Sequence, residues 1–285
     1  MKDKLKILLV ALIAVTFSFP AFAQRKEIRK ATLTETKYDI SDSVLIVAGK
    51  DKKIKPYAFA DRLDIKRVII EEGIEEIGEY AFWGCKNIEN INLPETLSTL
   101  GEACFKECES LESLCLPSGV KKIPRYMCAW NLSLKNVTLP AGLKDIGSHA
   151  FIYCKNLQDM TFPGKIEHIG SNVFSNCVSL REVSLPSSIT ELESYAFSGC
   201  TELRKAVLPA NDNMLGELIF NGCSKLKEIY CLSPVPPTFD CDSPLFDPLE
   251  KKTIDQCILY VLPGCEQSYR KAVGWNIFPH IQPAE

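Results

Sequence analysis

The sequence predicts a solenoid of about eight 23-residue repeats, in which short strands from successive repeats form a parallel sheet. Two recurring positions support this prediction. Phenylalanine recurs at intervals of 23 residues or twice that, with Cys128 in the one slot that lacks it: Phe59, Phe82, Phe105, Phe151, Phe174, Phe197 and Phe220. A proline preceded by leucine or phenylalanine keeps the same period, from Pro94 to Pro209. Such a period is typical of solenoids, whose units bury their apolar faces only against neighbouring units.

A strand is expected in each repeat just before this proline. Ile91 and Leu93 alternate with Asn92, and a period of two predicts a strand with both apolar side chains inward. Proline ends the strand because it has no N–H to donate. A second short strand is expected near Leu97 and Leu100, and a turn or short helix at the Ala-Phe segment forms the opposite wall. The pairs equivalent to Ile91/Leu93 are Leu114/Leu116, Val137/Leu139, Met160/Phe162, Val183/Leu185 and Ala206/Leu208.

Some repeats depart from the pattern. In the fourth, Met127-Cys128 replaces Ala-Phe, so that side-chain volume lost at one position is returned at its neighbour. Pro124 replaces a glycine in the same repeat, and Asp212 replaces an apolar residue in the last one. We expect irregular geometry in both repeats. The glycines themselves suit tight turns with positive φ, and they are Gly78, Gly101, Gly147, Gly170 and Gly216.

The chain contains 13 cysteines, of which six form one column. Asn131 fills the gap in this column without disturbing the register. Asparagine and a thiol can both hydrogen-bond a turning backbone from a buried position, so we expect buried free thiols rather than disulfides. The column contains Cys85, Cys108, Asn131, Cys154, Cys177, Cys200 and Cys223.

Four further cysteines lie near the carboxyl end: Cys231, Cys241, Cys257 and Cys265. One disulfide among them is plausible, for example Cys241 with Cys257, but the sequence does not choose among the pairings. A zinc site would favour paired Cys-x-x-Cys spacing, which is missing. We therefore expect no metal there.

Residues 1–23 are predicted to be a secretory signal peptide. Lys2, Lys4 and Lys6 precede the apolar stretch 7–19, and Ala21-Phe22-Ala23 suits a cleavage site before Gln24. The alternative is an uncleaved membrane anchor, although the stretch is short for a bilayer span. We expect no transmembrane segment in the mature chain.

The rest of the chain is predicted to be one elongated domain. Residues 24–53 form an amino-terminal cap around the apolar run Val44–Val47, and residues 54–232 form the repeats. Residues 233–285 form a carboxyl-terminal cap, in which an irregular Pro-rich loop precedes a strand and a short helix. Solenoids need such caps to cover the apolar core at both ends. The last coil would be covered by Tyr269, Val273 and Trp275.

No catalytic or cofactor-binding pattern is recognisable. There is no phosphate-binding loop, dinucleotide fingerprint or zinc-protease helix, and we expect neither a cofactor nor an enzyme. Cys128 and His149 lie in neighbouring repeats, but nothing in the sequence orients the imidazole. His168 is interpreted as a solvated partner of Glu167, and the acidic run 71–76 as a solubilising face rather than a calcium site. The net charge of −3 argues against nucleic acid as a partner.

Two surfaces are candidate binding sites. The first is the outer face of the predicted sheet, a polar strip suited to a protein or glycan. The second is a group of aromatic residues on the opposite wall, because exposed aromatic side chains are common interface anchors. The sheet-face candidates are Asn90, Asn92, Asn136, Thr138, Asp159, Thr161, Glu182, Ser184 and Tyr230; the aromatic candidates are Tyr80, Trp83, Tyr126, Trp130 and Tyr153.

The motif Ile-Gly-x-x-Ala-Phe-x-x-Cys with its Leu-Pro strand, as at residues 77–94, resembles the BspA-like leucine-rich repeats of bacterial surface proteins. The resemblance covers about residues 54–230 and extends to the end through 258–261 and 268–275, which look like that family's terminal strand and capping helix. It implies a leucine-rich-repeat solenoid that is secreted or exposed at the cell surface and binds a macromolecule, in some members as an adhesin. A periplasmic scaffold that binds a partner from the same cell is the alternative.

Overall fold

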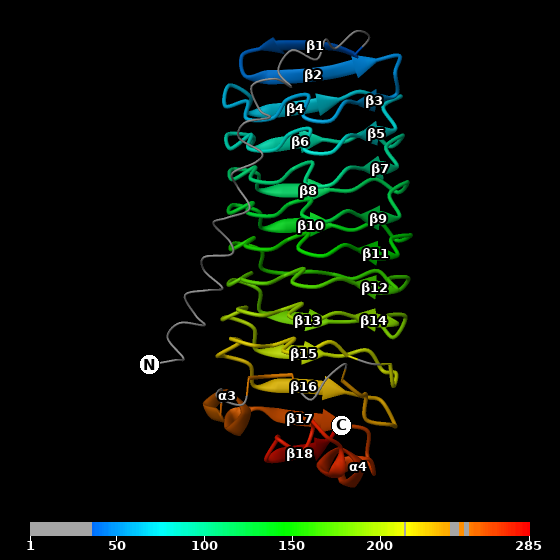
Figure 1. Ribbon diagram of the computed structural model, residues 1–285, viewed down its shortest axis with the longest axis vertical. Coiled ribbons are helices and arrows are strands. Elements are labelled where there is room, and N and C mark those ends of the chain that lie inside the picture. Colours follow the sequence, from blue (N-terminus) through cyan, green and yellow to red (C-terminus); the bar gives the residue numbers. More distant parts are fainter. Residues whose placement is uncertain (1–35, 214, 240–244, 248–250) are drawn as a thin grey trace, which may run out of the picture. The chain divides into compact units, whose positions relative to one another are not determined.

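The computed structural model describes residues 36–285 except 214, 240–244 and 248–250, so the predicted signal peptide lies outside the described residues. Glu35–Glu285 form one compact unit. This unit is a parallel-sheet solenoid whose coils lie about 23 residues apart in sequence, as predicted. Figure 1 shows the strands stacked one above another in two rows, with few helices.

The first row is the main sheet. Its strands pair in parallel, except that β1 pairs antiparallel with β2, and pairing is interrupted after β6 and after β10. Its elements are β1 (Thr36–Ser41), β2 (Val44–Gly49), β4 (Arg67–Ile70), β6 (Asn90–Asn92), β8 (Ser113–Cys115), β10 (Asn136–Thr138), β13 (Glu182–Ser184), β15 (Lys205–Val207), β16 (Glu228–Cys231), β17 (Ile258–Val261) and β18 (His280–Pro283).

The alternation of side chains within the main sheet is confirmed. In β8, for example, Leu114 is buried between exposed Ser113 and Cys115. One expected strand is absent, because residues 158–162 have no strand conformation. Phe162 occupies the position that leucine holds in the neighbouring repeats, and its ring packs edge-on against Phe174 at 5.7 Å. We attribute the gap between β10 and β13 to this bulkier side chain.

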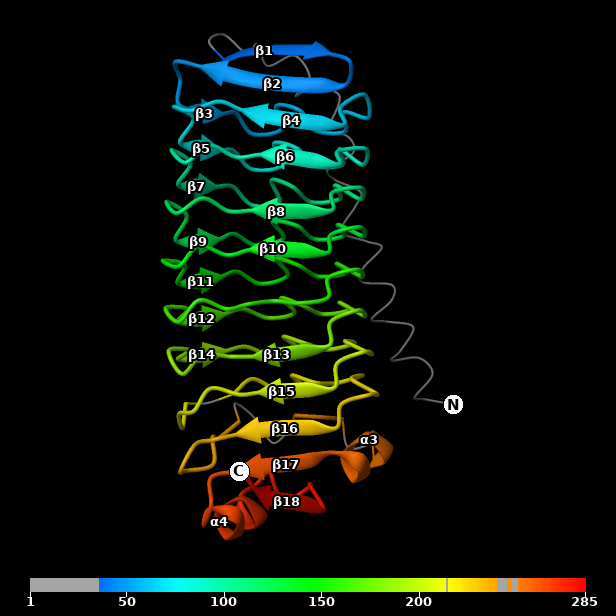
Figure 2. The ribbon, with the colours of Figure 1, turned by 180° about the vertical axis from the view of Figure 1, so that it is seen from behind.

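The second row, seen beside the main sheet in Figure 2, confirms the second short strand in every repeat but the last. This row is also interrupted, between β7 and β9. Pro124 follows β9 directly and lacks the N–H that Gly101 and Gly147 donate to the preceding coil, so the expected irregularity is found there. The elements are β3 (Lys53–Ile54), β5 (Glu76–Ile77), β7 (Thr99–Leu100), β9 (Lys122–Ile123), β11 (Asp145–Ile146), β12 (His168–Ile169) and β14 (Glu191–Leu192).

The repeat containing Asp212 is irregular as well. Around it the second row is reduced to single bridges, from Leu215 to Leu192 and to Phe239. The side chains of Asn211 and Asn213 donate hydrogen bonds to the carbonyl of Ile189. In more regular repeats a hydroxyl makes the equivalent contact, as Ser188 does to the carbonyl of Ile166.

The expectation of positive φ at the five repeat glycines is wrong, since none of them has it. They are needed because the chains approach closely: a Cβ at Gly101 would lie 2.3 Å from the amide nitrogen of Glu79 in the preceding coil. The left-handed conformation occurs two residues later, at Tyr80 and Tyr126 among others. Ring stacking between coils, such as Tyr57 on Tyr80 at 4.9 Å, helps to offset the energetic cost of the left-handed backbone conformation.

The phenylalanine column forms the centre of the core. All seven rings are at most 1% exposed, and successive rings stack, for example Phe151 on Phe174 at 5.5 Å and Phe174 on Phe197 at 5.3 Å. Met127 and Cys128 are fully buried where the column is broken. Their backbone bonds to adjacent coils, such as Cys128 N–H to the Ala150 carbonyl at 2.8 Å, keep the register.

The six column thiols are free and buried. Each donates a hydrogen bond to a backbone carbonyl 26 residues earlier, at 3.0–3.3 Å, as Cys85 does to Phe59 and Cys200 to Phe174. Asn131 serves the same turn differently, because its side-chain oxygen accepts the N–H of Cys108 at 2.9 Å. Cys257 is also free, and the suggested partner Cys241 lies outside the described residues.

At its carboxyl end the core is covered by α3 (Lys251–Gln256), α4 (Glu266–Lys271) and the chain that leads to β18. Tyr269 and Trp275 are fully buried, as expected, and hydrogen-bond the carbonyls of Ser233 and Pro237 at 2.9 and 2.8 Å. The expectation for Val273 is wrong: its side chain is 76% exposed. Phe246 covers the end of the phenylalanine column, with its ring centroid 6.2 Å from that of Phe220.

The exchange of volume between Met127 and Cys128 leads to a prediction. Cys128→Phe alone should destabilise the fold by about 1–3 kcal/mol through overpacking, and Met127→Ala alone by about 2–5 kcal/mol through a cavity. The double variant restores the Ala-Phe pattern and should recover most of the loss. Urea unfolding of the wild type, the two single variants and the double variant measures this coupling. Losses of unfolding free energy that simply added in the double variant would contradict the exchange of volume between the two positions.

Burial also predicts how the thiols react. It raises the pKa of Cys85 and of Cys154 to about 12, so the reactive thiolate is suppressed. In the native protein the six column thiols should resist iodoacetamide, whereas exposed Cys115 should react and serves as an internal control. In denaturant without reductant all six should become alkylated, as read by peptide mass spectrometry. Alkylation that required a reductant would show that the column is bridged.

Candidate functional site

The predicted sheet-face residues lie where they were expected. Asn90 and Asn92 on β6, Asn136 and Thr138 on β10 and Glu182 on β13 are exposed, as is Ser184. Asp159 and Thr161 are exposed too, although their segment is not a strand. These side chains are small and polar, and they form a flat solvated surface over the middle coils.

The surface changes character at the carboxyl end of the sheet. Tyr230 on β16 and Tyr260 on β17 pair directly, and their half-buried rings stack at 4.6 Å with an interplanar angle of 16°. The ammonium of Lys205, one coil before, lies 4.6 Å above the Tyr230 ring. Burial, helped by the nearby Glu228 carboxylate, raises the pKa of Tyr230, so its hydroxyl remains a hydrogen-bond donor. The result is a rigid aromatic ridge, defined as Tyr230, Tyr260 and Lys205.

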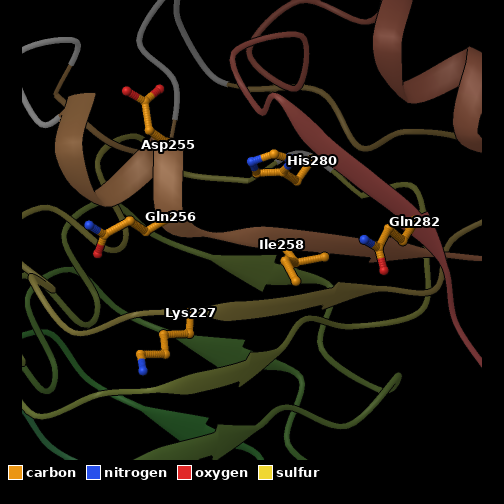
Figure 3. Close-up of a pocket in the computed structure, with 6 residues that line it drawn as sticks. All are labelled: Lys227, Asp255, Gln256, Ile258, His280 and Gln282. Carbon is orange, nitrogen blue, oxygen red and sulfur yellow. The ribbon is translucent and has the colours of Figure 1, made fainter.

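A recess of about 480 Å³ lies beside this ridge. Figure 3 shows its lining at the junction of α3, β17 and β18: Lys227, Asp255, Gln256, Ile258, His280 and Gln282. Gln282 pairs with Tyr260, and Ile258 lies between Glu228 and His280 in the neighbouring column of the same sheet. The ridge and the recess are therefore parts of one surface.

Of these residues only Tyr230 is a candidate from the repeat pattern of the sequence. Tyr260 follows Tyr230 by 30 residues rather than 23, so its place in the column is hidden from the period. The signal was the similarity of Glu228-Ile229-Tyr230-Cys231 to Ile258-Leu259-Tyr260-Val261, which aligns the two tyrosines. Nothing in the repeat pattern indicates β18, and hence His280 or Gln282.

The aromatic candidates on the opposite wall pack mainly on one another. Trp83 is only 7% exposed and cannot serve as an exposed anchor, because Tyr80 packs against it and the Lys106 side chain crosses it. Trp130 stacks on Tyr153 at 5.5 Å, and Lys106 lies 5.0 Å from the Trp130 ring. Tyr80, Tyr126, Trp130 and Tyr153 are half-buried and remain candidates.

His168 is placed differently from expectation. Glu167 pairs with Lys144 at 2.6 Å, and His168 lies between the carboxylates of two adjoining coils, 3.2 Å from Asp145 through Nδ1 and 2.8 Å from Glu193 through Nε2. Carboxylates on both sides favour a ring that carries both protons, since an imidazolium can donate from Nδ1 and from Nε2. Nε2 also lies close to Glu191 and Glu193, so that three potential metal ligands converge there.

The pair Cys128 and His149 shows no arrangement for catalysis. Burial raises the pKa of Cys128 well above its ordinary value and lowers that of His149. The imidazole stacks on Tyr126 at 4.7 Å, and its Nδ1 is buried without a hydrogen-bond partner. An activated thiol needs an oriented base, which this histidine is not.

The repeat can be compared with known families. The model of the BspA type leucine rich repeat region matches residues 52–129 and 121–236, which is more than half of the chain. The chain belongs to this family. The repeats of this family generally form non-enzymatic binding scaffolds.

Solved structures resemble this BspA-type protein in their fold. A leucine-rich repeat protein from Bacteroides ovatus is 19% identical with a TM-score of 0.50, over 84% of this chain and 80% of that one. The leucine rich repeat protein of T. pallidum is 26% identical with a TM-score of 0.46, over 73% and 85%. The comparison with curated proteins gave no match. In the part of the chain that the structure describes, every helix is too short or too polar to cross a membrane.

The environment of His168 predicts how stability depends on pH. Burial lowers its pKa, but the hydrogen bonds that the ring donates to Glu193 and Asp145 outweigh this effect and raise the pKa overall. A folded-state pKa above the unfolded-state pKa of about 6.5 stabilises the native protein at pH values below about 6.5. This stabilisation is lost as the pH rises through the folded-state pKa. His168→Gln should therefore lose more unfolding free energy, relative to wild type, at about pH 5.5 than at about pH 8.5.

Urea unfolding at the two pH values measures this difference. Thr161→Ser, at an exposed position without a titratable group, should show the same small change at both. A deficit of His168→Gln that grew with pH would contradict the imidazolium assignment.

Proposed function

We propose that the protein is an exported, non-catalytic binding protein that recognises a protein or glycan on another cell, as in adhesion to a host, through the outer face of its main sheet. The observation that carries this proposal is the aromatic ridge beside the recess. There, on the described surface, stacked aromatic rings, a cation and an open recess adjoin.

The ridge has the physical properties of an interface anchor. Tyrosine offers a large contact area with few rotatable bonds, so that little conformational entropy is lost on binding. Here the stack on Tyr260 and the Lys205 ammonium further restrict Tyr230. The small polar side chains of β10 and β13 extend the surface toward the middle coils, as a polar rim surrounds an anchor in many complexes.

Export is supported by the amino-terminal residues, which have the charge and hydrophobicity of a signal peptide. The absence of catalysis is supported by the environments of Cys128 and His149. Family membership agrees with a binding role, because solenoids present extended surfaces rather than deep clefts.

The proposal predicts that the ridge dominates binding to cells. Tyr260→Ala should weaken binding of the full chain to cultured epithelial cells at least about tenfold, since a buried aromatic anchor contributes about 2 kcal/mol or more. Flow cytometry with labelled protein measures the concentration for half-saturation. Tyr57→Ala is the matched control, because it also removes one of two stacked tyrosines but on the opposite wall. Equal losses in both variants would show that the ridge is not the binding site.

A further inference from the structure

A row of three cations runs along the stack of coils into the recess. Arg181, Arg204 and Lys227 occupy the same position of successive repeats, just before β13, β15 and β16, and all three are exposed. Their backbones are hydrogen-bonded in series, Arg204 N–H to the Arg181 carbonyl at 2.8 Å and Lys227 N–H to the Arg204 carbonyl at 3.0 Å. The positions are therefore about 4.8 Å apart, the spacing of adjacent strands. We call this the basic row.

The amino-terminal half of the same column provides an internal comparison. There cations and carboxylates form pairs, Lys66 with Glu89 at 3.8 Å and Lys135 with Glu112 at 3.2 Å, so that each of the two adjoining carboxylates has its own cation. Among the described residues no carboxylate forms an ion pair with a side chain of the basic row. Like charges in adjacent positions destabilise a sheet, so the stability of the fold does not account for three in succession.

One nearby carboxylate is paired with a cation outside the basic row. Glu202 pairs with Lys225 at 2.5 Å, and this contact, aided by Arg204 and Arg181, holds the pKa of that carboxyl below its usual range. Glu182 and Glu228 flank Lys205 in the adjacent column of the sheet face. No ion pair among the described residues therefore occupies the basic row, although Arg181 and Arg204 act on Glu202 and the carboxylate of Asp255 lines the recess.

Lys227 connects the row to the recess, whose lining includes the amides of Gln256 and Gln282 and the imidazole of His280. Within the described residues these three side chains have no hydrogen-bond partner. Amides and a neutral imidazole both donate and accept hydrogen bonds, as a surface that binds hydroxyl groups must. The cations and the amides together present complementary groups for a molecule with both negative charges and hydroxyls.

We infer that the basic row and the recess bind a linear anionic polysaccharide lying along the stack of coils. This inference rests on the proposed function and names its ligand class. An acidic peptide fits less well, because the backbone groups beneath the row are already bonded between coils and offer no ladder to an added strand. A single row on a chain of net charge −3 also lacks the broad basic face of nucleic-acid-binding proteins.

Binding of the full chain to heparin, neutral dextran and polyglutamate at physiological ionic strength tests this inference, with biolayer interferometry as the readout. Heparin should bind in a salt-dependent manner, and dextran and polyglutamate should bind at least tenfold more weakly. The variant R181Q/R204Q/K227Q should lose at least tenfold in heparin affinity. Its melting temperature should be unchanged or higher, because repulsion within the row is relieved.

The matched control is K66Q/K135Q/K144Q, which removes the same charge from paired positions and should bind heparin within about twofold of wild type. Equal losses in both triple variants, tight binding of polyglutamate or no binding of heparin would each overturn the inference. If R181Q/R204Q/K227Q still bound epithelial cells while Tyr260→Ala did not, the proposed function would stand and the ligand class would fall.

Discussion

Every coil of this protein is held by the coils above and below it, through two contacts that repeat with the sequence. Phenylalanine rings of adjacent coils stack, except across the Met127-Cys128 coil, and each column thiol donates a hydrogen bond to a carbonyl of an earlier coil. The ring supplies apolar burial. The thiol adds a second hydrogen bond, from another coil, to a carbonyl that already accepts a backbone N–H of its own turn. Because no coil is stable alone, a residue that loses its column position disturbs both neighbours.

This constraint separates structural from functional positions. Inward columns tolerate only exchanges that conserve volume or hydrogen bonding, such as Met127-Cys128 for Ala-Phe and Asn131 for cysteine. Outward columns carry no such restriction, and there the repeats differ most. The stacked tyrosines of β16 and β17 and the basic row both lie in the carboxyl-terminal coils, next to the recess. The distinctive chemistry of the surface is therefore concentrated at one end of the sheet.

Periodicity predicted the features that recur and missed those that occur once. The alternation of Ile91 and Leu93 predicted the main sheet, the cysteine column predicted buried thiols, and outward positions such as Asn136 were placed correctly. The role of the glycines was misjudged, because close approach between coils is a tertiary property that a single repeat does not display. Tyr260 and the recess were missed since the inserted α3 shifts the register from 23 to 30 residues.

We expect this surface to act outside the producing cell. Intact producing cells can be labelled with an antibody raised against the full chain, with permeabilised cells and culture medium measured in parallel. The expected result is signal on intact cells or in the medium. Signal that appeared only after permeabilisation would contradict it, and would indicate a scaffold that binds a partner of the same cell.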